Sequence, residues 1–247
     1  MSTELGLPEE GIEARAVVVR GGQALLAMLS AVVAGSVLTP TFESAGTALG
    51  FAADSATVAV FGTAGNAVGL TAAGLLFLLY AGDLDILRFR MPTRREALVA
   101  VAGAAGLTVA GYAILYGFAA LGLTPSTNRA LENPPAYFLA MIPLSFVTVA
   151  VAEEVVFRGV VQGELRRALG PAGAVAGASL LFGTLHYLAG VGTPTQRAVY
   201  VAVAATLSLG LGALYEYTDN LVVPIVVHGA YNAVQYVIQY LSATGGA

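Results

Sequence analysis

The sequence predicts an all-α protein, a polytopic bundle of transmembrane helices. Of its 247 residues, 57% are hydrophobic and only 11% are charged, whereas about a quarter of the residues in soluble domains are charged. The mean hydropathy is +0.79. The apolar residues gather in stretches of about 20, the length that crosses a bilayer as a helix. So little charge cannot cover a water-facing surface, so we expect a multi-pass protein of the cell membrane.

About seven stretches, with a range of six to eight, are long and apolar enough to span. Gly170 and Pro171 predict a turn that makes the fourth and fifth of them an antiparallel hairpin. Residues 40–56 are apolar enough to form a short re-entrant or interfacial helix. The predicted spans are 21–39, 57–81, 98–122, 137–157 with a helical continuation to about 168, 172–190, 197–215 and 221–242.

These spans form one domain. Residues 1–20 are expected to be a short cytoplasmic tail, and residues 21–247 a single transmembrane domain. The tail is acidic and lacks the basic region and cleavage site of a secretory signal. We therefore expect the first apolar run to remain as an anchor.

The basic residues predict the orientation. All 11 are arginines, and most precede the first span or lie in the second and fourth connections, which share one side of the membrane. Only Arg129 and Arg197 fall on the other side. Because cytoplasmic loops carry the excess of basic residues, the N-terminus is predicted to be cytoplasmic and the C-terminus outside. The arginines of the cytoplasmic side are Arg15, Arg20, Arg88, Arg90, Arg94, Arg95, Arg166 and Arg167.

Composition also excludes several classes of function. The chain has no cysteine, which rules out disulfides and thiolate chemistry. Two histidines are too few for a zinc finger. No basic patch with interleaved aromatic residues indicates nucleic acid. The expected partners are the lipid bilayer and a membrane-associated protein or peptide, and no feature indicates the oligomeric state.

Polar chemistry is concentrated in three short segments, EEVVFR (153–158), FGTLH (182–186) and HGAYN (228–232). Inserting an ionisable residue at the centre of the membrane costs about 2.5–3.5 kcal/mol even on the scale that gives the lowest values. Residues of this kind are therefore candidates for a functional or structural role. Glu154 and Arg158 are four apart and can pair on one helix face. Glu153 is turned away from that face, which leaves a carboxylate able to act as a base or an acid.

Helix geometry links the segments. Glu153 lies about 17 residues before the predicted turn and His186 about 15 after it, so the two reach nearly the same depth at 1.5 Å per residue. They can share a water. His228 and Asn232 lie on one face of the last span, where the amide can donate a hydrogen bond. Spans 4, 5 and 7 would thus assemble a site for peptide hydrolysis by an activated water.

Other interpretations fit some of these residues. Glu153, His186 and His228 match a catalytic set for a single divalent metal such as zinc, although the HEXXH signature is absent. Buried glutamate and histidine also mark proton-relay transporters, but those show repeats in two halves and this chain shows none. A catalytically silent membrane scaffold is a further alternative.

The three segments resemble the EExxxR, FxxxH and HxxxN motifs of the CAAX-protease and bacteriocin-processing family of intramembrane endopeptidases. The resemblance covers about residues 137–240 and preserves the order of the motifs. It implies that Glu153 and His186 activate the water, and that His228 and Asn232 stabilise the oxyanion. Supporting roles are implied for Glu154 and Arg158, and Phe182 is expected to shape the site.

The resemblance leaves cofactor and substrate open. Both metal-dependent and glutamate-dependent mechanisms are advocated for the family. We favour no cofactor, because an asparagine beside His228 suits an oxyanion role better than a zinc ligand. The prenyl-protein endopeptidases of the family remove the last three residues of a CAAX tail. The expected activity is therefore CAAX-type endopeptidase cleavage of a membrane-associated substrate. In the prenyl-protein endopeptidases of the family, that substrate is prenylated.

Overall fold

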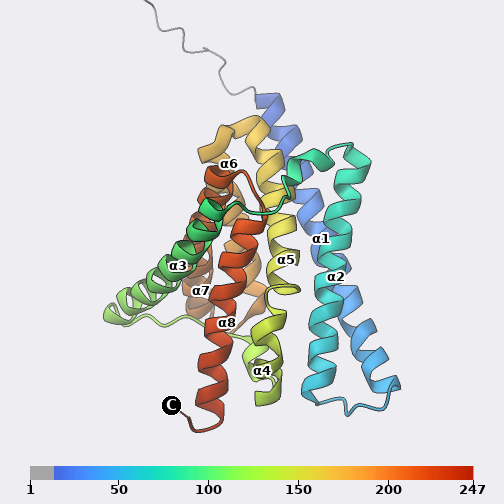
Figure 1. The fold of residues 1–247 in the computed structure, drawn as a ribbon, viewed down its shortest axis with the longest axis vertical. Helices are drawn as coiled ribbons and strands as arrows, with labels where there is room; N and C mark the ends of the chain where they lie inside the picture. The colour runs from blue at the N-terminus through green and yellow to red at the C-terminus, as the bar shows by residue number, and fades with distance from the viewer. Residues whose placement is uncertain (1–13, 247) are drawn as a thin grey trace, which may run out of the picture.

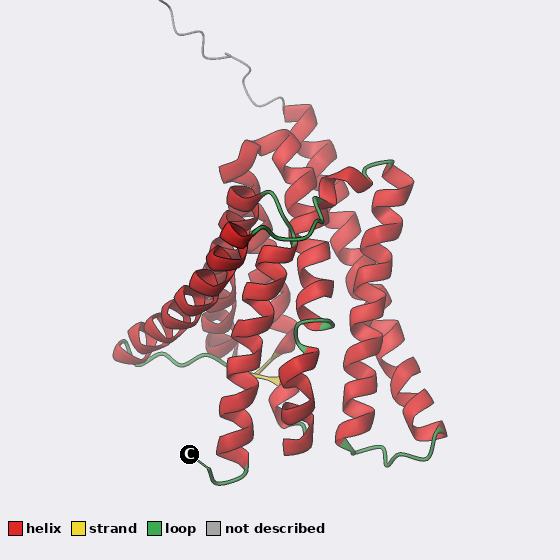
Figure 2. Cartoon of the chain, in the orientation of Figure 1, coloured by secondary structure: helices red, strands yellow, loops and turns green. Residues whose placement is uncertain are grey.

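The computed structural model describes residues 14–246, and they form a helical bundle with almost no sheet (Figures 1 and 2). The expected tail therefore lies mostly outside the described residues. The helices are α1 (Ala14–Ala48), α2 (Ala56–Ala81), α3 (Arg94–Ala120), α4 (Pro135–Leu144), α5 (Val149–Glu154), a π-helix (Val155–Gln162), α6 (Gly163–Ala189), α7 (Pro194–Thr218) and α8 (Val222–Ala243).

Short elements occupy the connections. Two 3₁₀ turns cover Leu84–Leu87 and Arg129–Glu132. Strand β1 (Thr127–Asn128) pairs antiparallel with β2 (Gly190–Val191), with Thr127 opposite Val191. This pairing ties the chain after α3 to the connection between α6 and α7.

Five apolar helical stretches in residues 14–246 are long enough to cross a membrane. One of them, Val149–Ala189, folds back on itself at Gly170, whose φ of 67° and ψ of 178° are not helical. Its two limbs are the predicted hairpin, and Pro171 begins the second limb. When the two limbs of the hairpin are counted separately, the five stretches contain six long helical limbs. Helix α8 is the seventh, in agreement with the predicted architecture.

Two elements differ from their predictions. The fourth span was expected as one helix over 137–157, but the chain breaks between α4 and α5 at residues 145–148. There the Ser145 hydroxyl donates a hydrogen bond to the Gly229 carbonyl at 3.2 Å. Phe146 lies so close to Gly229 that a Cβ added at position 229 would collide with it. The break thus lets this segment cross α8 at its motif glycine.

Residues 40–56 do not form a separate re-entrant helix. Instead α1 continues through Pro40 to Ala48, and a loop leads to α2, whose first turn is capped by Ser55. Thr39 Oγ1 donates to the Gly35 carbonyl just before the proline. Helix continuation is favoured here because α1 packs along α2 with glycines at the contact, among them Gly65 and Gly69.

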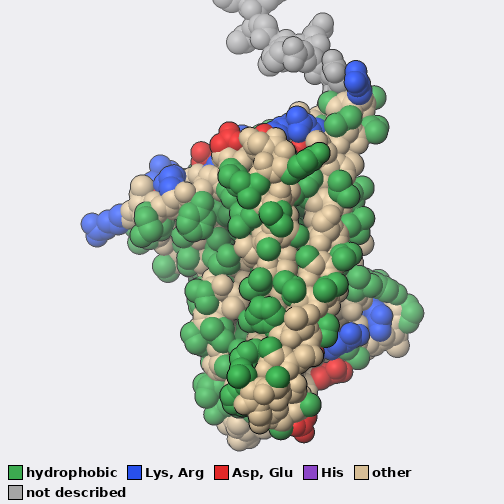
Figure 3. All heavy atoms as spheres, turned by 90° about the vertical axis from the view of Figure 1, so that its right-hand side faces the viewer, with side chains coloured by type: hydrophobic (Ala, Val, Ile, Leu, Met, Phe, Trp, Pro, Cys, Tyr) green, Lys and Arg blue, Asp and Glu red, His purple; other side chains and the backbone are tan. Residues whose placement is uncertain are grey.

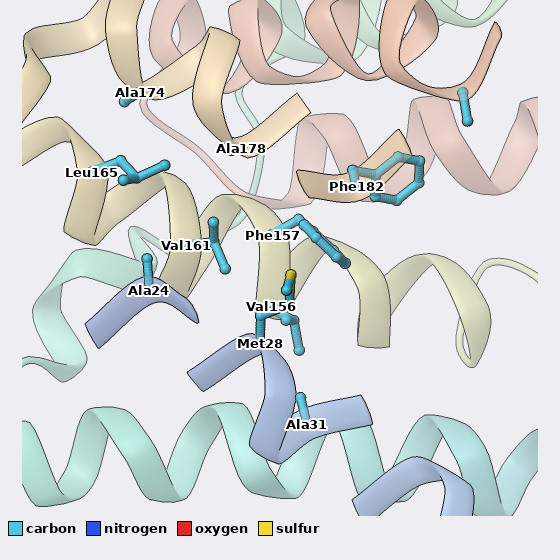
Figure 4. Packing of buried hydrophobic residues seen from close by; sticks show 11 residues of the cluster. Ala24, Met28, Ala31, Val156, Phe157, Val161, Leu165, Ala174, Ala178 and Phe182 are labelled. Atoms are coloured by element: carbon cyan, nitrogen blue, oxygen red, sulfur yellow. The ribbon is translucent and has the colours of Figure 1, made fainter. Parts of the chain in front are cut away.

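The core that holds the hairpin gathers residues from α1, the π-helix, α6 and α7 (Figure 4). Phe157 and Phe182 meet edge to face at a centroid distance of 4.9 Å. Such pairs add about 0.5–1.5 kcal/mol beyond burial. Their contact joins the first motif to the second, so the core fixes the position of both.

Candidate active site

A buried network connects the first and third motifs. Glu154 is fully buried, and its Oε1 lies 2.7 Å from Nδ1 of His228. Its Oε2 lies 3.1 Å from Nε of Arg158, whose side chain is 1% exposed. The ion pair expected from the four-residue spacing is therefore present. The same carboxylate also holds the histidine of α8, a contact that the sequence did not indicate.

Two further groups contact the Arg158 guanidinium. Its Nη2 donates to the Ser208 hydroxyl at 2.9 Å and to the Ser208 carbonyl at 3.1 Å. Its Cζ lies 5.1 Å from the centre of the Phe182 ring, a cation–π distance. Ser208 stands in α7, so one arginine links three helical limbs. The role of Ser208 was not predictable from the sequence, because a single serine in an apolar span belongs to no motif.

Glu153 has a different environment from its neighbour. Its side chain is 25% exposed, and its Oε2 lies 3.7 Å from Nε2 of His228. His228 therefore has a carboxylate near each ring nitrogen. Glu153 also lines a cavity of about 160 Å³ that is bordered by the three motifs. One carboxylate is thus enclosed and fully engaged, whereas the other faces open space.

His186 is fixed by its own helix. Its Nδ1 lies 2.8 Å from the Phe182 carbonyl one turn earlier. Because a carbonyl only accepts, this contact places the proton on Nδ1 and leaves Nε2 as the acceptor in the neutral ring. The ring also packs 5.5 Å from Tyr200. The spacing F-x-x-x-H is what brings the carbonyl and the ring nitrogen together.

The cavity brings together the four residues predicted to be catalytic. Glu153, His186, His228 and Asn232 all line it, as does Phe182. Glu153 and His186, which were expected to share a depth, thus border the same space. The closest contact of Glu153 with a histidine, however, is with His228. The lining also includes Asn128, whose Nδ2 donates to the Tyr200 hydroxyl at 2.8 Å.

The residues that a zinc site would use are Glu153, His186 and His228. Among residues 14–246, no three or more histidine, aspartate and glutamate side chains are grouped so as to hold a metal ion. Metal dependence therefore stays a prediction.

Comparison with known protein families gave one match. Residues 135–234 match the family model described as type II CAAX prenyl endopeptidase Rce1-like. Comparisons with curated proteins and with solved structures gave no match. The matched segment contains all three motifs, the cavity residues of α5, α6 and α7, and His228, Tyr231 and Asn232 of α8. Together with the long apolar helices, it supports a multi-pass membrane protein with protease activity of the CAAX type. The resemblance seen in the motifs is thereby confirmed, and residues 135–234 belong to the Rce1-like family of CAAX prenyl endopeptidases.

Proposed function

We propose that the chain hydrolyses a peptide bond of a membrane-associated protein or peptide with a water activated by Glu153 and His186. The observation that carries this proposal is the 160 Å³ cavity, which collects Glu153, His186, His228 and Asn232 from three helical limbs. A base, an imidazole acceptor and two donors around one space are the parts that water-mediated acyl cleavage needs.

In the first step, the water oxygen attacks the carbonyl carbon and its proton passes to Glu153. Glu153 suits this role because its carboxylate faces the cavity, whereas Glu154 is held on both oxygens. His186 orients the water through Nε2, because Nδ1 is occupied by the Phe182 carbonyl. Hydrolysis is completed when the C–N bond breaks and the amine leaves with the proton from Glu153.

The tetrahedral oxyanion is stabilised by His228 and Asn232. Glu154 contacts Nδ1 of His228 and holds the ring with Nε2 toward Glu153, so that a proton on Nε2 is the proposed donor to the oxyanion. The Asn232 amide follows one turn later on α8 and lines the same cavity. Donors that are already oriented stabilise an oxyanion without reorganisation. Glu154 and Arg158 are supporting residues that hold His228 in place.

The mechanism is proposed to need no metal. Detergent-purified protein is incubated with a prenylated CAAX peptide, with and without a chelator, beside Glu153→Ala. We expect the wild-type protein to cleave the peptide equally with and without the chelator, and Glu153→Ala not to cleave it. Cleavage that is lost in chelator and restored by zinc would contradict the metal-free mechanism. Wild-type cleavage by Glu153→Ala would contradict the assignment of the base.

A further inference from the structure

Tyr200 of α7 lies where the active cavity meets a second, larger cavity. It lines both the 160 Å³ cavity that holds the motif residues and an adjoining cavity of about 360 Å³. Asn232, which is proposed to stabilise the oxyanion, also lines both cavities. Tyr200 and Asn232 therefore border the same junction, although Tyr200 belongs to none of the three motifs.

The Tyr200 ring packs against the ring of His186. The two centroids are 5.5 Å apart and the ring planes are inclined at 71°, which is the edge-to-face arrangement of an aromatic pair. The orientation of His186 is itself set by the contact of its Nδ1 with the Phe182 carbonyl. Packing between α6 and α7 thus places the Tyr200 ring next to a histidine that is proposed to orient the water.

One hydrogen bond determines which role the Tyr200 hydroxyl can play. Nδ2 of Asn128 donates to the hydroxyl oxygen at 2.8 Å. An amide NH2 group can only donate, so the hydroxyl is the acceptor in this contact and keeps its own proton for another acceptor. Among residues 14–246, no second protein group forms a hydrogen bond with this hydroxyl. The proton is therefore available to an oxygen atom in the cavity.

The orientation of the Asn128 amide is fixed as well. Its Oδ1 accepts a hydrogen bond of 2.8 Å from the backbone N–H of Ala130 and so caps the 3₁₀ turn Arg129–Glu132. Because the amide oxygen is used there, Nδ2 is the atom left for Tyr200. Asn128 also stands opposite Gly190 in the pairing of β1 with β2. The strand pair thus brings an amide from the chain after α3 to the active cavity.

The apolar character of the bundle favours a use for this hydroxyl. In Figure 3, hydrophobic side chains cover the middle of the flank, whereas charged side chains lie toward its upper and lower parts. In apolar surroundings, a hydroxyl is stabilised when its proton meets an acceptor. An oxyanion at the junction, next to Asn232, would be such an acceptor.

We propose that Tyr200 is a catalytic residue that donates its O–H to the tetrahedral oxyanion beside Asn232, and that Asn128 is the positioning residue that leaves this proton free to do so. The inference rests on the proposed function and deepens it by a donor outside the motifs. The O–H bond stays intact, because Tyr200 stabilises charge and transfers no proton. Asn128 lies before the matched segment 135–234, so part of the site comes from chain that the family match does not cover.

Removal of the hydroxyl alone tests the donor. Tyr200→Phe keeps the ring against His186, so kcat on the prenylated CAAX peptide should fall about 10²-fold while KM and the melting temperature stay close to wild type. Tyr187→Phe makes the same change next to His186 at a residue that lines neither cavity, and it should keep the wild-type kcat. A wild-type kcat for Tyr200→Phe, or an equal loss in both variants, would overturn the proposal.

Reversal of the hydrogen bond tests the positioning residue. Asn128→Asp keeps an oxygen for the Ala130 N–H but replaces the NH2 group by an acceptor, so the Tyr200 proton should turn to the carboxylate. We expect kcat to fall as much as in Tyr200→Phe, at an unchanged melting temperature. Combining the two substitutions should cause no further loss, because the aspartate acts through the hydroxyl. Additive losses, or a wild-type kcat for Asn128→Asp, would refute the positioning role.

Binding of a phosphinate peptide tests the same donor without turnover, because its tetrahedral anion resembles the oxyanion. Detergent-purified Tyr200→Phe should bind this peptide about 10²-fold more weakly than wild type, since the lost contact belongs to the transition state. Unchanged affinity would contradict a contact with the oxyanion. Failure of the proposed function would appear differently, as wild-type cleavage of the prenylated peptide by Glu153→Gln. An inactive Glu153→Gln beside a fully active Tyr200→Phe would refute this inference alone.

Discussion

At the scale of single residues, two adjacent glutamates have opposite environments. Glu154 is fully buried and contacts His228 and Arg158, whereas a quarter of the Glu153 side chain is exposed. Neighbouring positions on a helix point about 100° apart, so one faces the core and the other faces the cavity. This difference assigns structural support to Glu154 and chemistry to Glu153.

Removing Glu154 should destabilise the protein. Glu154→Ala leaves the Arg158 guanidinium buried without its carboxylate, a change that costs about 3–5 kcal/mol in buried pairs. We expect a large fall in the melting temperature of the detergent-purified protein. Glu153→Ala is the matched control and should melt close to wild type. Equal melting temperatures for all three proteins would contradict the supporting role.

Truncating Asn232 should affect turnover more than binding. Asn232→Ala removes one proposed donor to the oxyanion, and loss of one such donor costs about 10²–10³-fold in kcat. KM should change little, because the amide acts on the transition state. Steady-state kinetics on a cleaved peptide measure both constants. A raised KM with unchanged kcat would instead place Asn232 in substrate binding.

Local spacing predicted some contacts of the site and not others. The pair Glu154–Arg158 follows from a four-residue spacing. The bond between Glu154 and His228 joins residues 74 positions apart, and Arg158 reaches Ser208 across 50. Neither is visible in a single sequence, because both depend on how α7 and α8 pack against α5 and the π-helix.

At the scale of elements, the site depends on irregular helices. The π-helix Val155–Gln162 begins directly after the two glutamates, and such helices are frequent at functional sites. The lengths of the apolar stretches predicted the limbs, and Gly170 with Pro171 predicted the turn. They did not predict the π-helix, or the break at 145–148, where Ser145 and Phe146 contact Gly229 of α8.

Adding a methyl group to Gly229 should disturb this crossing. A Cβ there would lie 2.6 Å from Cδ1 of Phe146 and 3.0 Å from its Cα, and backbone cannot swing aside. Gly229→Ala should therefore lower both the melting temperature and the cleavage rate by displacing His228. Gly117→Ala in α3, where a Cβ meets nothing within 4 Å, should be neutral or slightly stabilising. Similar behaviour of the two variants would show that the contact at Gly229 is unimportant.

At the scale of the whole molecule, ion pairs at the arginine-rich end tie sequence-distant segments together. Arg167 donates to Asp83 at 2.6 and 2.8 Å, which joins the hairpin turn to the loop after α2. Arg88 pairs with Asp219 at 2.6 Å, which joins the same loop to the end of α7. The positions of these arginines in the chain predicted that they lie on one side. Their acidic partners could not be predicted, because they come from other loops.

The contact of Asp83 with Arg167 predicts a pH dependence. The hydrogen bond from Arg167 lowers the pKa of the Asp83 carboxyl below its ordinary value. The contact therefore stabilises the fold above about pH 4, and this stabilisation is lost as the pH falls through the lowered value. Asp83→Asn should lower the melting temperature at pH 7, and its difference from wild type should shrink below about pH 4. A difference that stays constant with pH would contradict this origin.

Replacing Glu153 by glutamine tests the central claim most directly. Glu153→Gln keeps the size of the side chain and removes its basicity, so turnover of a cleaved peptide should fall about 10²–10⁴-fold. The melting temperature should stay at the wild-type value, because Glu153 is not part of the buried network. Loss of turnover at unchanged stability is the predicted result. Turnover that remains at the wild-type rate in a folded Glu153→Gln protein would contradict the account.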